Sequence, residues 1–325
     1  MILPGPRCPR CAGSALLAVT LSLLVIASVA YLLTIGSSID VALADRVKDV
    51  HSANYIAEAG FQHLRESLRV ENCTSYKDLG VTSFGDGQYS ASVTPKFNSP
   101  VTVVATGQTG SGASFALLQT RVRVFDAPLS TEISPGPSVD DTWINKSAPW
   151  FNYGKSGRLE IGDFGTEESY GLIRFNISAI PPGALINAAS IRLYFAGASV
   201  QPPGSGIFAH RIEKFWDEGR KHGTVGDGAT WLFRDLALTW DSAGGDYVAG
   251  SVSFMPLGAA SSFHFSDITL IMQEWIDGTA QNHGVLLRSS AGVKQAEFMT
   301  GDESSQSLRP RLLVSYACEC GAPGC

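Results

Sequence analysis

Charged residues are scarce in this chain of 325 residues, since Asp, Glu, Lys and Arg together make up only 17%. The net charge of −6 is spread along the sequence, and no cluster of Lys and Arg marks a nucleic-acid surface. No HExxH, GxSxG or phosphate-loop motif occurs. The acidic pairs Asp140/Asp141, Glu167/Glu168 and Asp217/Glu218 would point to opposite faces of a strand. We therefore expect a protein that is not an enzyme and does not bind nucleic acid.

Residues 14–35 carry no charge at all and form the longest apolar run of the chain. Such a run is long enough to cross a bilayer, because about 20 apolar residues span its core. Arg7 and Arg10 precede it, so the short N-terminus is expected to stay cytoplasmic. The sequence thus predicts a single-pass membrane protein whose bulk lies outside, in the periplasm or at the cell surface.

The helix is expected to continue beyond the apolar run, to residue 69. Apolar or small residues recur there at steps of three and four, which predicts one stripe of an amphipathic helix. The stripe comprises Val47, Val50, Asn54, Ala57, Phe61, Leu64 and Leu68.

A cleaved secretory signal is the alternative for the same segment. Ala42-Leu43-Ala44 offers a cleavage site of the A-x-A type, and two arginines supply the basic start. The apolar run is longer than the roughly 7–15 residues of a usual signal core, which favours a retained anchor. Both interpretations stay open.

The stem carries a family resemblance. A short basic leader that ends at Gly13, an apolar helix and an amphipathic helix with ANYIAEAGFQHL at 53–64 resemble PilX-like members of the type IV pilin and pseudopilin class. The resemblance implies that a prepilin peptidase cuts after Gly13 and leaves Ser14 as the mature N-terminus. It also implies pilin or pseudopilin subunits as partners and the inner membrane as the point of departure. Ser14 and Ala18 differ from the major-pilin pattern, so a minor subunit fits better.

Two further segments follow the stem. Strand patterns at 88–94, 101–105 and 115–125 predict a small pilin-like β domain over 70–125, packed on the stem. Residues 126–138 contain three prolines and are predicted to be a semi-stiff linker outside any sheet.

From residue 139 to residue 316 the pattern is mainly β, with short strands and Gly/Pro turns that indicate a two-sheet sandwich. One short helix interrupts it, with Asp267 as the expected N-cap and Gly278 as the stop. The expected strands cover 141–145, 158–161, 170–176, 190–195, 207–212, 251–255, 284–288, 295–300 and 311–315.

The same region carries a second resemblance, on motifs that occur in order along its length. They are Asp141-Thr142-Trp143-Ile144, Gly171-Leu172-Ile173-Arg174-Phe175, Ile191-Arg192-Leu193-Tyr194, Phe215-Trp216-Asp217-Glu218-Gly219, Gln273-Glu274-Trp275-Ile276-Asp277-Gly278 and Arg309-Pro310-Arg311-Leu312. The series resembles a DNRLRE domain, the group that includes the family-96 carbohydrate-binding modules. The resemblance implies a jelly-roll-like β-sandwich on a secreted or surface protein, with a polysaccharide as partner for some members and no catalysis.

Cysteines divide by the expected topology. Cys8 and Cys11 form a lone CxxC pair in the leader, which cannot complete a four-ligand zinc site. The disulfide candidates Cys73, Cys318, Cys320 and Cys325 would lie outside the membrane, the last three in a Cys-rich tail over 317–325. Three pairings among the four remain open.

Aromatic residues supply the candidates for ligand contact. Trp150, Phe151 and Tyr153 lie in a polar loop, where exposed rings would stack on a polysaccharide. The alternative is that these rings pack beneath the loop. By contrast, the tryptophans within the family motifs, which are Trp231, Trp240 and Trp275, are expected in the core.

Asp141 and Asp302 stand near the two ends of the sandwich region and are expected to meet on neighbouring strands. Their hard oxygen ligands would suit a structural Ca²⁺. Two functions are compatible with all these features. One is a surface-displayed, polysaccharide-binding adhesion subunit, and the other is a structural or assembly subunit whose sandwich acts as a spacer or protein-contact domain.

Overall fold

The computed structural model describes residues 11–70, 73, 75–134, 139–225 and 227–322. Within these ranges the side chains of 11–18, 36–40, 69–70 and 251–252 are left undescribed. The protein is mainly β and divides into two compact units. Unit 1 comprises Met1–Ser67, Tyr76–Lys96 and Val101–Val122, and unit 2 comprises Leu68–Ser75, Phe97–Pro100 and Arg123–Cys325.

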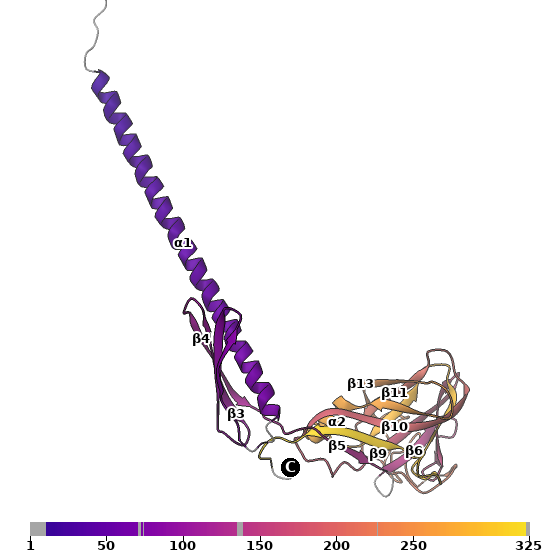
Figure 1. Cartoon of the computed structure of the whole chain (residues 1–325). Coiled ribbons are helices and arrows are strands. Elements are labelled where there is room, and N and C mark those ends of the chain that lie inside the picture. The colour runs from indigo at the N-terminus through magenta and orange to yellow at the C-terminus, as the bar shows by residue number, and fades with distance from the viewer. Residues whose placement is uncertain (1–10, 71–72, 74, 135–138, 226, 323–325) are drawn as a thin grey trace, which may run out of the picture. The chain divides into compact units, whose positions relative to one another are not determined.

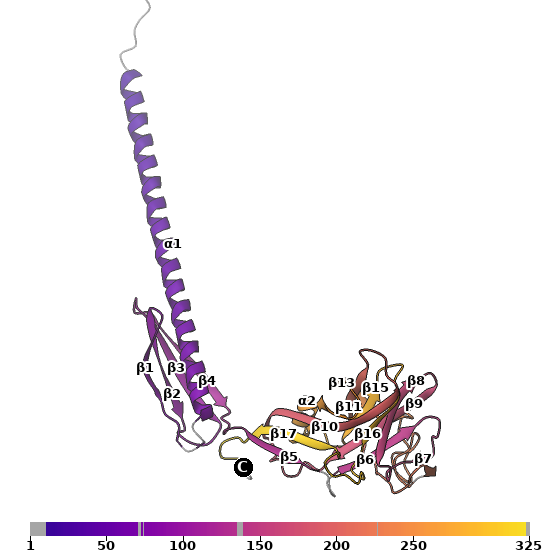
Figure 2. The same ribbon diagram turned by 45° about the vertical axis from the view of Figure 1, so that its right-hand side comes forward.

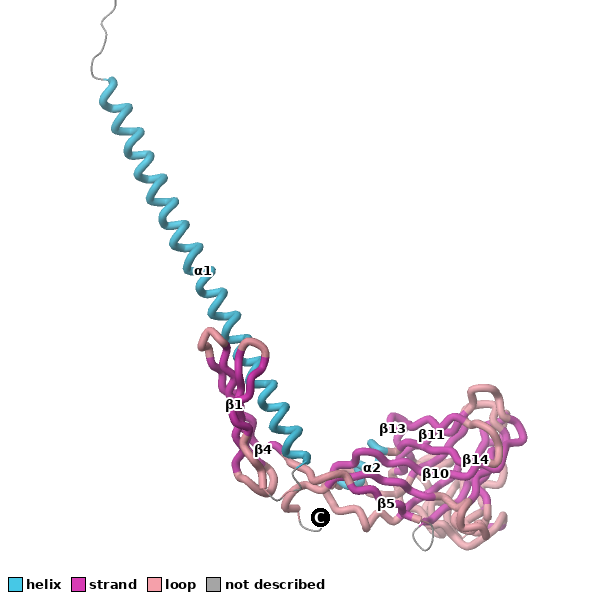
Figure 3. The backbone as a smooth tube through the Cα atoms, viewed as in Figure 1, coloured by secondary structure: helices cyan, strands magenta, loops and turns pink. Residues whose placement is uncertain are grey.

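A single long helix, α1 (Cys11–Val70), has 60 residues and dominates unit 1 (Figures 1 and 3). At 1.5 Å per residue it is about 90 Å long. Its apolar side chains between 19 and 35 are exposed, as Leu24 at 66% and Leu33 at 69% illustrate. In the part of the chain that is described, no helix is long and apolar enough to cross a membrane.

A four-stranded antiparallel sheet completes unit 1 and lies along the second half of α1 (Figure 2). Its order is β1-β2-β3-β4, and the strands are β1 (Leu79–Phe84), β2 (Gly87–Thr94), β3 (Val101–Thr109) and β4 (Ser114–Val122). Alternate residues of β3 from Val101 to Thr109 are buried, as expected for a strand with one face against a core.

Small residues allow the helix and this sheet to approach closely. A Cβ at Gly107 would lie 2.2 Å from the carbonyl oxygen of Ala53 and 2.4 Å from the amide nitrogen of Ala57. Ala53, Ala57 and Leu64 are fully buried.

The stripe predicted for the helix is partly wrong. Val47 and Val50 are about half exposed, and Asn54 is exposed as well. The buried positions instead include Ala53, Ile56 and Gly60. Residue size decides this, because the sheet covers the face where small residues let the two backbones meet.

Unit 2 contains the remaining strands and the short helix α2 (Thr269–Ile276). Its main sheet has the order β13-β11-β15-β9-β8-β16-β10-β17-β5, with β14 paired to β10 and β6 paired to β9. A separate two-stranded ribbon joins β7 to β12. The strands are β5 (Leu129–Ile133), β6 (Val139–Asn145), β7 (Phe151–Asn152), β8 (Arg158–Phe164), β9 (Glu167–Phe175), β10 (Leu185–Val200), β11 (Gly206–Ile212), β12 (Thr224–Val225), β13 (Tyr247–Pro256), β14 (Ser262–Asp267), β15 (Val285–Ser289), β16 (Lys294–Met299) and β17 (Arg311–Ala317).

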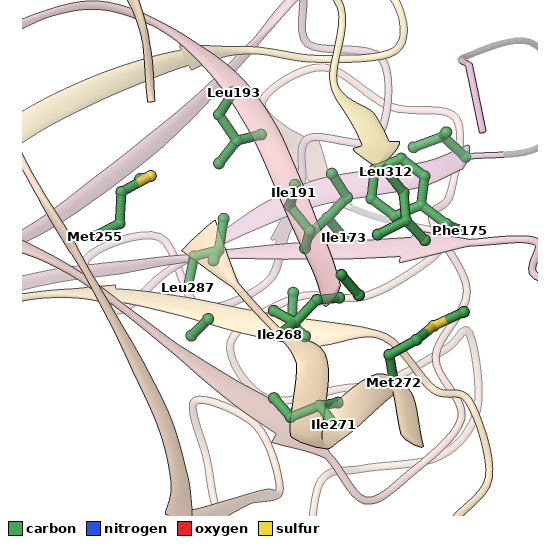
Figure 4. Packing of buried hydrophobic residues seen from close by; sticks show 14 of the residues in the cluster. Ile173, Phe175, Ile191, Leu193, Met255, Ile268, Ile271, Met272, Leu287 and Leu312 are labelled. Carbon is green, nitrogen blue, oxygen red and sulfur yellow. The ribbon is translucent and has the colours of Figure 1, made fainter. Parts of the chain in front are cut away.

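This sheet has two halves, β13-β11-β15-β9 and β16-β10-β17-β5, which β8 joins. Buried side chains from both halves and from α2 form the main core of unit 2 (Figure 4). Strand β8 links the two halves, since its residues 158–161 pair with β16 and its residues 162–164 pair with β9. In Figure 4 the helix residues Ile271 and Met272 lie in the same cluster as Ile191 of β10 and Leu287 of β15.

A second buried cluster involves the other face of β6 and β9. Ile144 and Leu172, which alternate with residues of the main core, share this cluster with three tryptophans from the segment that follows β11. These are Trp216, Trp231 and Trp240, each at most 7% exposed. The expectation that Trp231, Trp240 and Trp275 belong to the core is confirmed, with Trp275 in the main cluster.

The prediction that 126–138 is a linker outside any sheet is wrong for residues 129–133. These residues form β5, which pairs with β17 along its whole length. Pro128 precedes the strand, and the strand itself contains no proline, so every residue can donate to the ladder. Residues 135–138 lie outside the described part.

The expected cap of α2 is displaced by one residue. Ile268 occupies the N-cap position and makes no side-chain cap bond. Asp267 ends β14 and accepts hydrogen bonds from the amide and hydroxyl of Thr269 through its Oδ1. The aspartate therefore closes the turn between strand and helix instead of capping the helix.

One disulfide joins Cys73 to Cys320 within unit 2. Cys318 is disulfide-bonded as well, and Cys325 lies outside the described residues. The Cys73–Cys320 bond fixes one pair among the disulfide pairings that the sequence left open.

Candidate ligand-binding end of unit 2

Of the three aromatic residues predicted for ligand contact, two have exposed rings and the third packs inward. Trp150 is 54% exposed, and its ring lies 5.6 Å from that of Phe233. Phe151 is 36% exposed and pairs with Val225 in the β7–β12 ribbon. These two rings remain available at the surface.

Tyr153 lies inward and is only partly exposed. Its ring stacks on the buried indole of Trp143, with centroids 3.8 Å apart and planes inclined by 22°. Burial raises the pKa of the Tyr153 hydroxyl, and the nearby carboxylate of Glu160 adds to this. For Tyr153 the packing alternative therefore describes its surroundings best.

A fully buried amide holds the loop that carries these rings. The Nδ2 group of Asn152 donates to the carbonyl oxygens of Glu218 and Ala229, at 2.8 and 2.9 Å. Its Oδ1 accepts from the amides of Gly154 and Lys221. The side chain thus ties the loop to the segment after β11, which lies more than 60 residues further along the chain.

Two glycines permit this close contact. A Cβ at Gly154 would lie 2.2 Å from the carbonyl oxygen of Glu218. Gly219 has a φ of +78°, and a Cβ there would lie 2.5 Å from Oδ1 of Asn152. Any other residue at either position would force the two segments apart.

The predicted calcium ligands lie near one another and both already accept hydrogen bonds, although Oδ1 of Asp141 has no partner among the described residues. Asp141 is buried, and its Oδ2 accepts from the amide of Gly301 at 2.7 Å. Asp302 accepts from the ammonium of Lys155 with both oxygens, at 3.1 and 3.2 Å. Lys155 thus supplies a positive charge beside the two carboxylates.

This arrangement fits a Ca²⁺ poorly, because Ca²⁺ takes six to eight oxygen ligands and is repelled by a neighbouring ammonium. Within the described residues, no three side chains of the His, Cys, Asp or Glu type are placed to hold a metal. The arrangement favours an internal network of carboxylates and Lys155 over a calcium site.

Glu218 belongs to this network, although the sequence did not single it out as a site residue. Its Oε1 accepts from the backbone amide of Asp141 at 3.0 Å. Burial raises the pKa of Glu218 to about 7, and burial also raises the pKa of Asp141 well above its ordinary value. In the sequence Glu218 belonged to the acidic pair Asp217/Glu218 and to the Phe215–Gly219 motif, and neither indicates what the carboxylate contacts.

We expect unit 2 to become less stable as the pH rises from about 4.5 to about 7. In this window the folded protein keeps a proton on Glu218 that the unfolded chain has lost, so the free energy of unfolding falls with rising pH. The full shift would correspond to roughly 3 kcal/mol, and because Glu218 is partly exposed, solvent screening lowers the expected fall to about 2 kcal/mol for this one carboxyl. Denaturant unfolding of the full chain at a series of pH values measures it.

The variant Glu218→Gln keeps an acceptor for the Asp141 amide but cannot titrate. Its stability should vary less between pH 4.5 and 7 than that of the parent. The exposed Glu213→Gln serves as control and should leave the pH profile unchanged. An equal pH dependence in parent and Glu218→Gln would refute the assignment.

No protein-family model matches the chain, and no curated protein is significantly similar to it.

Proposed function

We propose that this protein is a non-catalytic, surface-displayed subunit that α1 anchors in a membrane or a pilus-like filament, and whose unit 2 binds polysaccharide. The observation that carries the proposal is the exposed apolar length of α1, which continues without a break into the segment packed on the sheet of unit 1. Such an apolar surface calls for a lipid or protein environment.

Two features of the stem support retention over cleavage. Residues 42–44 lie inside α1, so the alternative cleavage site is helical. The helix continues through residue 44 into the segment from Ala53 onward that packs on β3, so a cut after residue 44 would fall inside one continuous helix. The proposed cut between Gly13 and Ser14 falls where the side chains are outside the described residues.

The resemblance to PilX-like subunits fits a helix laid on a small antiparallel sheet, and it supports pilin or pseudopilin partners. For unit 2 we propose a jelly-roll-like sandwich of the DNRLRE type. The core between the two halves of its sheet and the short helix α2 support this proposal.

Polysaccharide binding is supported by Trp150 and Phe151. Both rings are exposed on a loop that the buried Asn152 holds in place, so little conformational entropy is lost when a sugar stacks on them. We place the first contact there.

The double variant Trp150→Ala/Phe151→Ala should lower the affinity of the full chain for a soluble polysaccharide about 30-fold, since each ring contributes on the order of 1 kcal/mol. The melting temperature should hardly change, because both rings are exposed. Titration calorimetry and a thermal melt of detergent-solubilised protein measure the two quantities. Leu236→Ala, also in an exposed loop, is the matched control and should alter neither.

A structural or assembly subunit is the second candidate, and a different surface favours it. Phe254 of β13, Phe265 of β14 and Leu270 of α2 are exposed at 47, 53 and 82%. Exposed apolar groups of this kind serve protein contacts. If the parent protein binds none of a panel of neutral, amino and acidic polysaccharides, unit 2 is a spacer or protein-contact domain instead.

A further inference from the structure

A concave site lies in unit 2, and neither Trp150 nor Phe151 is among its lining residues. Residues of β6, β8, β9 and β16 line a pocket of about 230 Å³. This is below the roughly 300–1,000 Å³ of pockets for drug-sized ligands, so the pocket suits a group about the size of one sugar ring. Its polar and aromatic lining includes Trp143, Asn145, Glu160, Ser169, Lys294 and Gln295.

The aromatic part of the lining is Trp143, which is 5% exposed and carries the stacked ring of Tyr153 on one face. Its Nε1 group is buried and has no hydrogen-bond acceptor among the described residues. An unpaired buried donor costs about 1–3 kcal/mol. A ligand oxygen that reached this edge would offset that cost.

Around the pocket one carboxylate has no direct ion pair: burial and the neighbouring Glu297 raise the pKa of Glu160, and Arg158 and His222 oppose this only through their charge. Glu167 pairs with Lys294 at 3.4 Å, and Glu168 pairs with Lys146. The neighbouring Arg158 is engaged by Glu297. The side chain of Glu160, by contrast, forms no hydrogen bond or ion pair with the described residues, although it is only partly exposed.

A half-buried, unpaired carboxylate is a strong acceptor for hydroxyl and amino hydrogens. It repels a second carboxylate or a sulfate, and more strongly than at an open surface, because the local dielectric is low. The pocket is therefore electrostatically suited to a neutral or amino sugar and unsuited to a uronic acid.

We propose that this pocket is a sugar subsite in which Glu160 accepts ligand hydroxyl or amino groups, so that unit 2 prefers neutral and amino polysaccharides over acidic ones. The proposal rests on the polysaccharide-binding function and names its ligand class. In this arrangement Trp150 and Phe151 supply stacking area for any glycan, whereas the pocket selects the type of sugar.

The test compares three probes on the detergent-solubilised full chain: a soluble neutral β-glucan, a chitosan oligosaccharide and polygalacturonate. The parent should bind the first two at least 10-fold more tightly than the third. Glu160→Ala should lower the affinity for the neutral glucan about 10-fold, as expected for loss of a charge-assisted hydrogen bond. Glu160→Gln should narrow the difference between neutral and acidic probes, because it removes the repulsion but keeps an acceptor.

Glu213→Gln, an exposed acidic residue outside the pocket, is the control and should keep the parent's order of affinities. Thermal melts establish that each variant is folded. Unchanged glucan binding by Glu160→Ala, with loss of binding only in Trp150→Ala/Phe151→Ala, would overturn the pocket and leave the proposed function standing. A preference of the parent for polygalacturonate would also overturn the pocket. No binding of any probe by the parent would overturn both proposals.

Discussion

Gly107→Val is expected to unfold the sheet of unit 1 while unit 2 stays intact. The new side chain would begin 2.2 Å from the carbonyl oxygen of Ala53 and 2.4 Å from the amide nitrogen of Ala57. Both are backbone atoms of α1, so no rotation of a side chain can relieve the clash. The sheet must separate from the helix, and the buried face of β3 then becomes exposed to water.

The loss should be at least 3 kcal/mol, since separation forfeits the burial of several side chains. Hydrogen exchange read by mass spectrometry on the full chain measures it, with protection lost in β2 and β3 and kept in β9 and β10. Gly80→Val is the matched control, because nothing lies within 4 Å of its Cβ position. Protection of β3 that equalled the parent's in Gly107→Val would contradict the close packing.

Trp216→Ala is expected to have the largest effect within unit 2. Trp216 is completely buried, its Nε1 donates to the carbonyl oxygen of His283 at 2.7 Å, and the guanidinium of Arg174 lies 5.0 Å from its ring. Truncation leaves a large cavity in the second cluster and the partly buried carbonyl of His283 without its donor. Replacement of a buried tryptophan by alanine costs about 3–5 kcal/mol.

For a unit of this size the loss corresponds to a fall in the melting temperature of roughly 10 °C. Differential scanning calorimetry of the full chain records it as a shift of the unit 2 transition. The adjacent Phe215 is 50% exposed, so Phe215→Ala should lower the transition by only a few degrees. Equal shifts for the two variants would show that the cluster beneath Trp216 contributes little.

The pH dependence attributed to Glu218 is also linked to Trp216, because the two residues are two positions apart in the same segment. Trp216 packs into the second cluster, while Glu218 contacts the amide of Asp141. Loss of the tryptophan should therefore also reduce the pH dependence, since the carboxyl would become more solvated and its pKa would fall towards 4.5.

The local alternation of apolar and polar residues predicted strands that have one buried face. The alternation of Tyr89, Ala91 and Val93 with polar residues in 88–94 predicted β2 within one residue of its start, because one face of this strand is buried. The same rule failed for β5 and β14. Both are formed because β17 and β10 present free ladder groups to them, and sequence periodicity does not record which strand has a vacant side.

The candidate site, too, combines features that the local sequence predicts with features that only the tertiary structure decides. Composition and loop context were enough to select Trp150 and Phe151, since aromatic rings in a polar loop tend to be exposed. They could not separate these two from Tyr153, because its stacking partner Trp143 lies on another strand.

The sequence by itself determined a long helix, a β-rich remainder and the aromatic loop, because each depends on residues close together in the chain. The tertiary structure alone decided which carboxylates are buried together and which one is left unpaired. Asp141 meets Glu218 across 77 residues, and Arg158 is engaged by Glu297 across 139 residues. Charge pairing depends on distances in space, and the fold brings these groups together through contacts that no local spacing encodes.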